Sequence, residues 1–259
     1  MRRNLLLAVA MMFVWSSALS AAEPVVIKPF NGSCLEGWNF KRGNRINCWT
    51  VGKLEADATT FSASLLMGEE KGVMINLVPA DWNRSRNNPY RDVDPPRAAA
   101  WNRENPSSGV DIYTKERFGD ITVKLEFLIL RGGNSGVYLM GEYELQIADS
   151  YGRGELGPGG MGGIWVTSAP LTNASRPPGT WQTLEIEFFA PRFNADGEKI
   201  ANGLFRRVLL NGVLIQENVE VERSTGGGLT GREAPTGPLM FQGDHGPVAF
   251  RNIEIIVKK

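Results

Sequence analysis

A period of two governs the hydrophobic pattern over much of the chain. Within 121–130, alternate positions are occupied by apolar side chains: Ile121, Val123, Leu125, Phe127 and Ile129. Similar alternation recurs in 181–189, 205–210, 213–216, 238–242 and 248–257. Such a pattern places one row of side chains on a buried sheet face and the other row on the opposite face. No long stretch has a 3.6-residue period, so we predict an all-β fold, an antiparallel β-sandwich.

Turn residues indicate how some strands connect. Asn211-Gly212 is typical of a type I′ hairpin, because both residues tolerate positive φ angles. Segments 61–66 and 73–78 read as a strand pair around the turn MGEEKG. Further strands are expected within 25–50, and the last two strands are expected to form a closing hairpin through GDHGP.

Two segments lack this periodicity. Residues 81–108 carry Trp82, Tyr90 and Trp101, and we interpret them as a long loop packed beside a binding cleft. Residues 152–163 contain a literal GxGxxG, but Pro158 and the further glycines there cannot propagate the helix that a dinucleotide-binding turn requires. We therefore expect a flexible loop at a cleft rim.

The segment 132–152, GGNSGVYLMGEYELQIADSYG, holds most of the candidate chemistry. Its odd-numbered apolar residues form one face: Val137, Leu139, Tyr143, Leu145 and Ile147. Tyr138, Met140, Glu144 and Gln146 occupy the other face. A carboxylate beside an amide can bind a polar ligand, although an ordinary solvated sheet face has the same pattern.

The N-terminal segment has the features of a signal for export. Arg2 and Arg3 precede an apolar run over 5–15, and Ser20-Ala21-Ala22 supplies small residues for cleavage. We expect residues 1–22 to be a signal peptide, residues 23–259 to be a single domain, and the mature protein to be periplasmic or secreted without a membrane anchor.

The charge of the mature chain argues against nucleic-acid binding, and its two cysteines raise the question of a disulfide. The mature chain would have 26 basic and 28 acidic residues, with no basic stripe, so no nucleic-acid partner is expected. Cys34 and Cys48 are the only cysteines. In an oxidising compartment we expect them to form a disulfide, the alternative being two buried thiols.

Several motifs together resemble one known family. They are D-I-Y-T-K-E-R-F-G-D at 111–120, the N-S-G turn at 134–136, Y-E-L-Q-I-A-D at 143–149, Q-G-D-H-G at 242–246 and F-R-N-I at 250–253. Their order and content are similar to the 3-keto-disaccharide hydrolase family, and the resemblance covers nearly the whole mature chain. It implies a concanavalin-A-like jelly roll with long loops at the concave face.

The resemblance also implies a reaction. Members cleave glycosides whose glucose ring has already been oxidised at C3 by a separate oxidoreductase, the partner expected upstream. A C3 ketone acidifies the C2 proton, so a base can form an enolate and the C1 substituent can leave. Such chemistry needs a base, an electrophile and an acid, and no cofactor.

The resemblance and the strand positions together rank the candidate residues. Glu144 and the only histidine, His245, are the expected catalytic pair. Seven residues are expected to bind substrate: Glu126, Asn134, Tyr138, Gln146, Asp149, Gln242 and Arg251. Asp149 and Asp244 have an alternative role as turn caps. We expect no metal, although a divalent cation held by Glu144, Asp149, Asp244 and His245 is an alternative.

Two other functions are compatible with a polar sheet face. A noncatalytic lectin-like module would bind carbohydrate through that face and through Tyr90, Trp101 and Trp165. A retaining glucanase would need an E-x-D-x-x-E strand, but Gln146 replaces the middle carboxylate here. Relative to shorter family members, segments 81–108 and 190–203 look like additions, which leaves the substrate size open.

Overall fold

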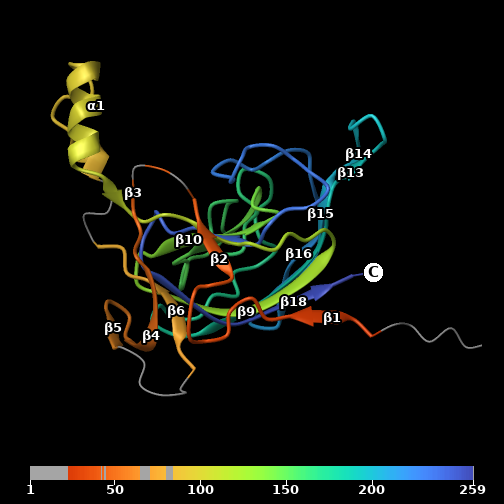
Figure 1. Ribbon diagram of the computed structural model, residues 1–259. Coiled ribbons are helices and arrows are strands. Elements are labelled where there is room, and N and C mark those ends of the chain that lie inside the picture. The colour runs from red at the N-terminus through yellow and green to blue at the C-terminus, as the bar shows by residue number, and fades with distance from the viewer. Residues whose placement is uncertain (1–22, 42, 44, 65–70, 80–83, 259) are drawn as a thin grey trace, which may run out of the picture.

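The computed structural model describes residues 23–41, 43, 45–64, 71–79 and 84–258. In these residues two antiparallel sheets pack face to face, one of nine strands and one of five (Figure 1). This confirms the all-β sandwich expected from the sequence. The expected signal peptide, Trp82 and residues 67–70 of the expected MGEEKG turn lie outside the described residues. No helix in the described part of the chain is long and apolar enough to cross a membrane.

The large sheet has the strand order β16-β15-β12-β9-β18-β6-β4-β5, and β1 pairs with the end of β18. Its strands are β1 Val25–Ile27, β4 Trp49–Ala56, β5 Phe61–Ser64, β6 Val73–Asn76, β9 Ile121–Ile129, β12 Gln182–Phe189, β15 Gly203–Leu210, β16 Val213–Val221 and β18 Val248–Val257. The small sheet has the order β11-β10-β17-β8-β2. Its strands are β2 Trp38–Phe40, β8 Ile112–Thr114, β10 Asn134–Leu139, β11 Tyr143–Ala148 and β17 Met240–Phe241.

The core lies between the inner faces of the two sheets. The apolar set of β9 is buried there as expected, and so are Leu184, Ile186 and Phe188 of β12. Phe241 of the small sheet stacks on Phe250 of the large sheet, with ring centroids 4.0 Å apart. Since such alternating sets fill the space between two sheets, the period of two is the physical origin of the sandwich.

Two expected hairpins are wrong. The described parts of the expected pair, β5 and β6, do not pair with each other, because β4 lies between them and pairs with both. Gly52 of β4 permits the close approach of β5, since a Cβ there would lie 2.6 Å from the Ser64 carbonyl oxygen. The closing hairpin is wrong because β17 and β18 belong to different sheets, so residues 243–247 cross between them. The Asn211-Gly212 turn is confirmed, with φ angles of 54° and 81°.

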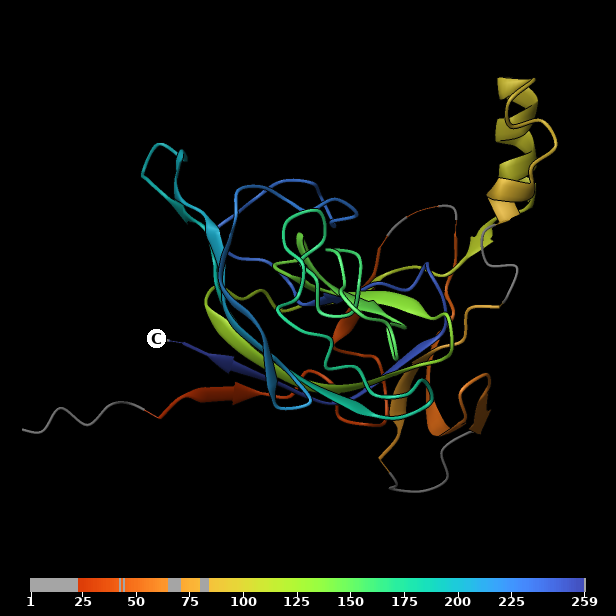
Figure 2. The same ribbon diagram turned by 180° about the vertical axis from the view of Figure 1, so that it is seen from behind.

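The loop expected at 81–108 contains regular structure. After a 3-10 turn, η1 Arg84–Asn87, the helix α1 Pro95–Glu104 begins at Asp94, whose side chain accepts a hydrogen bond from the Arg97 amide. Figures 1 and 2 show α1 standing away from both sheets, so the expectation of a loop packed beside a cleft is wrong. Asp94 is a favourable N-cap and proline fits the first turn, which explains a helix without an apolar face.

The remaining elements are short. β3 Arg45–Ile46 pairs in parallel with β7 Ser107–Ser108, and β13 Arg192–Phe193 pairs with β14 Lys199–Ala201 in a projecting hairpin (Figure 1). Residues 152–163 form turns without a helix, as expected. The disulfide prediction is wrong in this structure, because Cys34 and Cys48 are both free thiols. Each sulfur contacts its own turn, with Cys34 beside Asn31 and Cys48 beside the Ile46 carbonyl.

The stacked pair between the sheets gives a stability test. Phe250→Ala leaves a cavity against Phe241, and we expect it to lower the free energy of unfolding by about 3 to 5 kcal/mol. Phe193→Ala, in the projecting β13–β14 hairpin, removes the same atoms outside the core and should cost about 1 kcal/mol or less. Urea unfolding followed by circular dichroism measures both. Equal losses in the two variants would contradict the core assignment.

Candidate active site

A row of polar side chains crosses the small sheet on the face that points away from the core. Gly136 of β10 lies opposite Gln146 of β11, and the Gln242 amide donates to the Gly136 carbonyl at 2.9 Å. The pairing of β17 with β8, and of β8 with β2, continues the row to Asp111 and Lys41. Residues opposite one another in a sheet share a face. The polar row therefore reads Gln146, Gly136, Gln242, Asp111 and Lys41.

Glu144 and Tyr138 form the adjacent row, directly opposite each other on β11 and β10. The Glu144 carboxyl leans over Gly136, where an added Cβ would overlap its Oε1 atom. Only glycine leaves this space open. The sequence predicted that these side chains share a face, but not that the face is buried. Glu144 is only 3% exposed and Tyr138 only 1% exposed.

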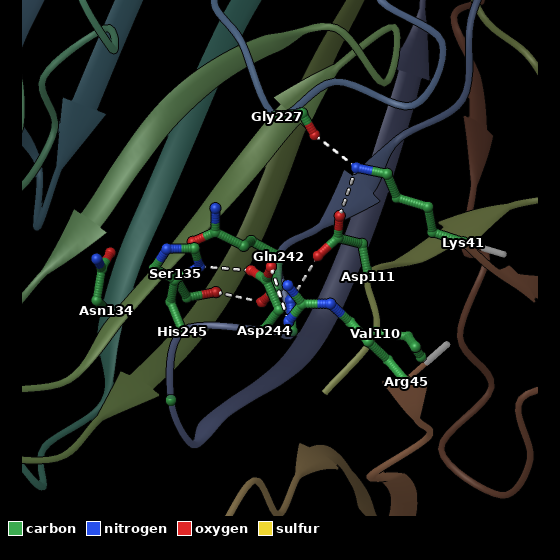
Figure 3. A network of polar contacts seen from close by, with 12 residues as sticks. Lys41, Arg45, Val110, Asp111, Asn134, Ser135, Gly227, Gln242, Asp244 and His245 are labelled. Atoms are coloured by element: carbon green, nitrogen blue, oxygen red, sulfur yellow. Dashed lines mark hydrogen bonds and ion pairs between the residues drawn. The ribbon is translucent and has the colours of Figure 1, made fainter. Parts of the chain in front are cut away.

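Residues 224–231 cover this face. The Glu144 amide donates to Thr225 Oγ1 at 2.9 Å, and Gly227 lies against the Tyr138 hydroxyl. Lys41 Nζ donates to the Gly227 carbonyl at 2.7 Å and to Asp111 Oδ2 at 3.1 Å, which joins the covering segment to the sheet (Figure 3).

The covering segment is also anchored at Glu142. The buried carboxylate accepts hydrogen bonds from the Thr230 amide at 2.8 Å, the Thr230 hydroxyl at 2.7 Å and the Gly231 amide at 3.0 Å. The Ser224 hydroxyl also lies 3.2 Å from Oε2, so four donors on one segment satisfy this buried group. Glu142 therefore has a structural role in holding residues 224–231 over the polar row.

The crossing turn 243–246 brings His245 to the same place. Asn76 of β6 donates to the carbonyls of Gly243 at 2.8 Å and Gly246 at 3.2 Å, and the Gly243 amide donates to Asp111 Oδ1 at 3.0 Å. Figure 3 shows His245 and Asp244 beside Gln242 and Asn134. His245 Nδ1 contacts the Asp244 carboxylate, whose other oxygen pairs with Arg45 at 3.2 Å.

Burial dominates the electrostatics of Glu144. Desolvation raises the pKa of its carboxyl to about 7, against the opposing effects of a hydrogen bond from Tyr138 and the charge of His245. Asp111 and Asp244 raise that pKa further. Among the described residues, Glu144 Oε1 has no hydrogen-bond partner. A carboxyl group with these properties can accept a proton near neutral pH.

The pKa values of the neighbouring titratable groups are shifted as well. Burial and the Glu144 charge raise the pKa of Tyr138, so it stays a neutral phenol that can donate. The hydrogen bond to Asp244 raises the pKa of His245, although burial opposes it. Burial raises the pKa of Asp111 in spite of the Lys41 charge. Burial alone would raise the pKa of Asp244. The hydrogen bond with His245 and the charge of that ring outweigh burial and hold the pKa below its ordinary value.

The structure brings together six of the nine residues expected at the site: Asn134, Tyr138, Glu144, Gln146, Gln242 and His245. Asn134 joins through Gln146 Nε2, which donates to its Oδ1 at 3.1 Å. Asp149 instead accepts from the Gly132 amide at 2.8 Å, which is the turn-capping alternative.

Glu126 and Arg251 do not join the cluster. They pair on the outer face of the large sheet, where Arg251 Nε lies 2.7 Å from Glu126 Oε2 and the guanidinium stacks over Trp181. The reason is positional: both belong to the rows opposite the core sets of β9 and β18. The aromatics Tyr90 and Trp101 are also remote from the small sheet, because they lie in and before α1.

Comparison with known proteins agrees with this geometry. The model of the 3-keto-alpha-glucoside-1,2-lyase-like domain family matches residues 26–256. The chain belongs to this family. A structure from Parabacteroides distasonis ATCC 8503, described provisionally as a glycosyl hydrolase, is 25% identical with a TM-score of 0.60, and the match covers 94% of this chain and 95% of that one.

A second structure from the same organism, with the same provisional description, is 16% identical with a TM-score of 0.53, covering 90% and 94% of the two chains, and supports the fold. No curated protein matches. The family match and the first of these structures support a carbohydrate-processing enzyme.

Several residues of the candidate site escaped the sequence analysis. Asp111 stands directly before a short strand, where alternation alone could have placed it opposite the core. Lys41, Asn76 and Glu142 gave no such signal, because their roles depend on segments far away in the chain. Within the described residues, no group of three or more His, Cys, Asp or Glu side chains is arranged to hold a metal ion. The absence of a cofactor therefore stays a prediction.

The raised pKa of Glu144 predicts a pH-dependent stability difference. The folded protein keeps this proton up to about pH 7, whereas the unfolded chain releases it near 4.5, so wild-type stability falls as pH rises between these values. Glu144→Gln lacks the titrating group. Its free energy of unfolding relative to wild type should rise by about 3 kcal/mol from pH 4.5 to pH 8. Urea unfolding at both pH values measures this, and a constant difference would contradict the assignment.

Proposed function

We propose that the chain cleaves the glycosidic bond of 3-keto-glucosides or 3-keto-disaccharides, with Glu144 as the base that removes the C2 proton. One observation carries the proposal. A buried carboxyl with a pKa near 7, one oxygen of which no described residue satisfies, lies directly opposite a neutral phenol and within the electrostatic influence of a histidine paired with aspartate. The family match and the provisional glycosyl hydrolase description of the first structural neighbour support it.

The reaction needs one base and two donors. The Glu144 carboxylate takes the C2 proton, and the electron pair of that C–H bond forms the C2–C3 double bond of an enolate. The pair then forms the C1–C2 double bond as the C3 carbonyl returns and the C1–O bond breaks. The leaving oxygen takes a proton. Subsequent addition of water across C1 and C2 completes hydrolysis, whereas release before addition gives the elimination product.

Each role has a candidate of suitable protonation state. Tyr138 is a neutral donor beside Glu144 and can hydrogen-bond the enolate oxygen. His245, whose proton is retained through its bond to Asp244, can protonate the leaving oxygen. Gln146, Gln242 and Asn134 supply amide groups for sugar hydroxyls. The Oε1 atoms of both glutamines lack partners among the described residues.

A conventional glycosidase mechanism fits this cluster less well. It requires two carboxyl groups acting on one bond. Here Asp111 accepts hydrogen bonds from Lys41 and the Gly243 amide, and Asp244 contacts His245 and Arg45. Their oxygens are already engaged, whereas Glu144 Oε1 is not. The lectin alternative needs neither a raised pKa nor a proton donor, and turnover separates it from the enzyme.

The surroundings of the reaction are also part of the proposal. A ketone at C3 has to be installed by a separate oxidoreductase, because the proposed elimination and hydration include no oxidation. The leader at 1–22 would export the chain, which places the reaction in the periplasm or outside the cell.

Turnover of oxidised substrates tests the proposal. We expect the mature protein to release 3-keto-glucose, or the corresponding glucal, from a 3-keto-glucoside but not from the unoxidised glucoside. Glu144→Gln and His245→Ala should each lower kcat by about 10² to 10⁴. Glu126→Gln, on the outer face of the large sheet, is the matched control and should keep wild-type activity. No release from α- or β-linked 3-keto substrates would refute the proposal, and tight glycan binding unaffected by Glu144→Gln would favour the lectin.

Proton exchange tests the role of Glu144 separately from bond cleavage. A 3-keto sugar without a leaving group should incorporate deuterium at C2 in D₂O, because enolate formation does not need C1–O cleavage. We expect Glu144→Gln to slow this exchange by about 10² or more, followed by NMR. Exchange no faster than in buffer, or full exchange by the variant, would exclude Glu144 as the base.

A further inference from the structure

The glycine-rich segment 152–163 leads into an extra pairing along the outer edge of the small sheet. Ile164 forms an antiparallel bridge with Leu145, the Gln146 amide donates to the Gly163 carbonyl at 2.8 Å, and the Trp165 amide donates to the Glu144 carbonyl at 3.1 Å. Ile164 is buried in the core, as Leu145 is. Residues opposite one another share a face, so Trp165 lies on the same face as Glu144.

Trp165 extends the second row of this face. The row now reads Trp165, Glu144 and Tyr138, contributed by three neighbouring backbone segments. The two aromatic neighbours differ in accessibility. Tyr138 is 1% exposed, whereas Trp165 is 38% exposed. The benzo edge of the indole lies against Gly159, where an added Cβ would be 2.9 Å from Cζ3. Gly159 therefore fixes the ring while leaving much of its surface open.

The backbone after Trp165 is strained. Val166 has a φ of 55°, which β-branched residues rarely adopt, and its side chain is exposed. The turn is held by hydrogen bonds between Ile164 and Ser168 in both directions. A strained backbone conformation persists only where surrounding contacts hold it in place. Such conformations are common at ligand-binding sites. Here the strained turn directly follows Trp165 and ends the pairing of residues 163–165 with β11.

The chemistry of the proposed function, on which this inference rests, gives the indole a role. C2 has two ring neighbours, C1 and C3. If Tyr138 donates to the oxygen on C3, then C3 lies on the Tyr138 side of Glu144, and C1 with its leaving group lies on the opposite side. That side is occupied by Trp165.

We propose that Trp165 is a specificity-determining residue that stacks on the ring of the leaving group. The occupant is a ring with an apolar face, as a pyranose or an aryl group has, because an exposed indole surface binds such faces by apolar contact. A methyl leaving group has no ring and cannot use this surface. Trp165 thereby selects 3-keto-glycosides of ring-containing alcohols over those of small alcohols.

Substrates that differ only in the leaving group test this role. For a 3-keto-disaccharide with a glucose leaving group, Trp165→Ala should lower kcat/KM on the order of tenfold, and Trp165→Phe should restore most of the loss. For methyl 3-keto-glucoside the same variants should change kcat/KM by less than about threefold. Trp181→Ala, which removes a tryptophan from the far face, is the matched control and should affect neither substrate. Equal losses for both substrates, or no loss for either, would overturn the proposal.

A binding measurement keeps this test separate from the proposed reaction. In the Glu144→Gln background, calorimetry with the same two ligands measures the stacking contribution without turnover. Trp165→Ala should raise Kd for the disaccharide on the order of tenfold and leave Kd for the methyl glycoside within about threefold. If the wild type cleaves neither substrate but Trp165→Ala raises Kd only for the disaccharide, the proposed reaction is wrong and the role of Trp165 in stacking is supported. Equal changes in Kd, or no binding of either ligand, would overturn the stacking surface itself.

Discussion

The desolvation of one carboxyl group determines how this side of the molecule is built. An ionised carboxylate buried in protein is costly unless it is paired, so the group holds its proton to higher pH instead. Glu144 is buried in this way, with an oxygen that no described residue satisfies. Gly136 makes room for that oxygen, and Tyr138 faces it as a neutral donor. The segment 224–231 keeps water away.

Glu142 shows what the same burial does when partners are supplied. It is also 3% exposed and stands two residues before Glu144, yet its carboxylate accepts hydrogen bonds from Thr230 and Gly231. Glu142, in the turn before β11, thus anchors the covering segment, while Glu144 on the strand is left with unused acceptor capacity beneath that segment. The difference between a structural and a reactive glutamate is set by the neighbours, because the side chains are identical.

The sequence predicts the parts of this arrangement that depend on local periodicity. Alternation correctly placed the core sets of β9 and β12 and the shared face of Tyr138, Glu144 and Gln146. It could not show that loops bury that face, or that Lys41 and His245 meet there from distant parts of the chain. It also wrongly predicted that β5 and β6 pair with each other, because local alternation does not show that β4 lies between them. The sequence of α1 contains N-cap and proline signals for a helix start. The helix packs on neither sheet and has no apolar face, so the 3.6-residue hydrophobic period that would have predicted it is missing.

The central position of β18 constrains the order of assembly. This strand lies between β6 and β9 and also pairs with β1, so strands from near residues 25, 75 and 125 meet only on 248–257. Any nascent chain that has not yet reached these residues leaves the facing edges of β1, β6 and β9 without hydrogen-bond partners. The large sheet is therefore completed after synthesis of residue 257 rather than during elongation. Until β18 is available, the strands that pair with it cannot complete the large sheet.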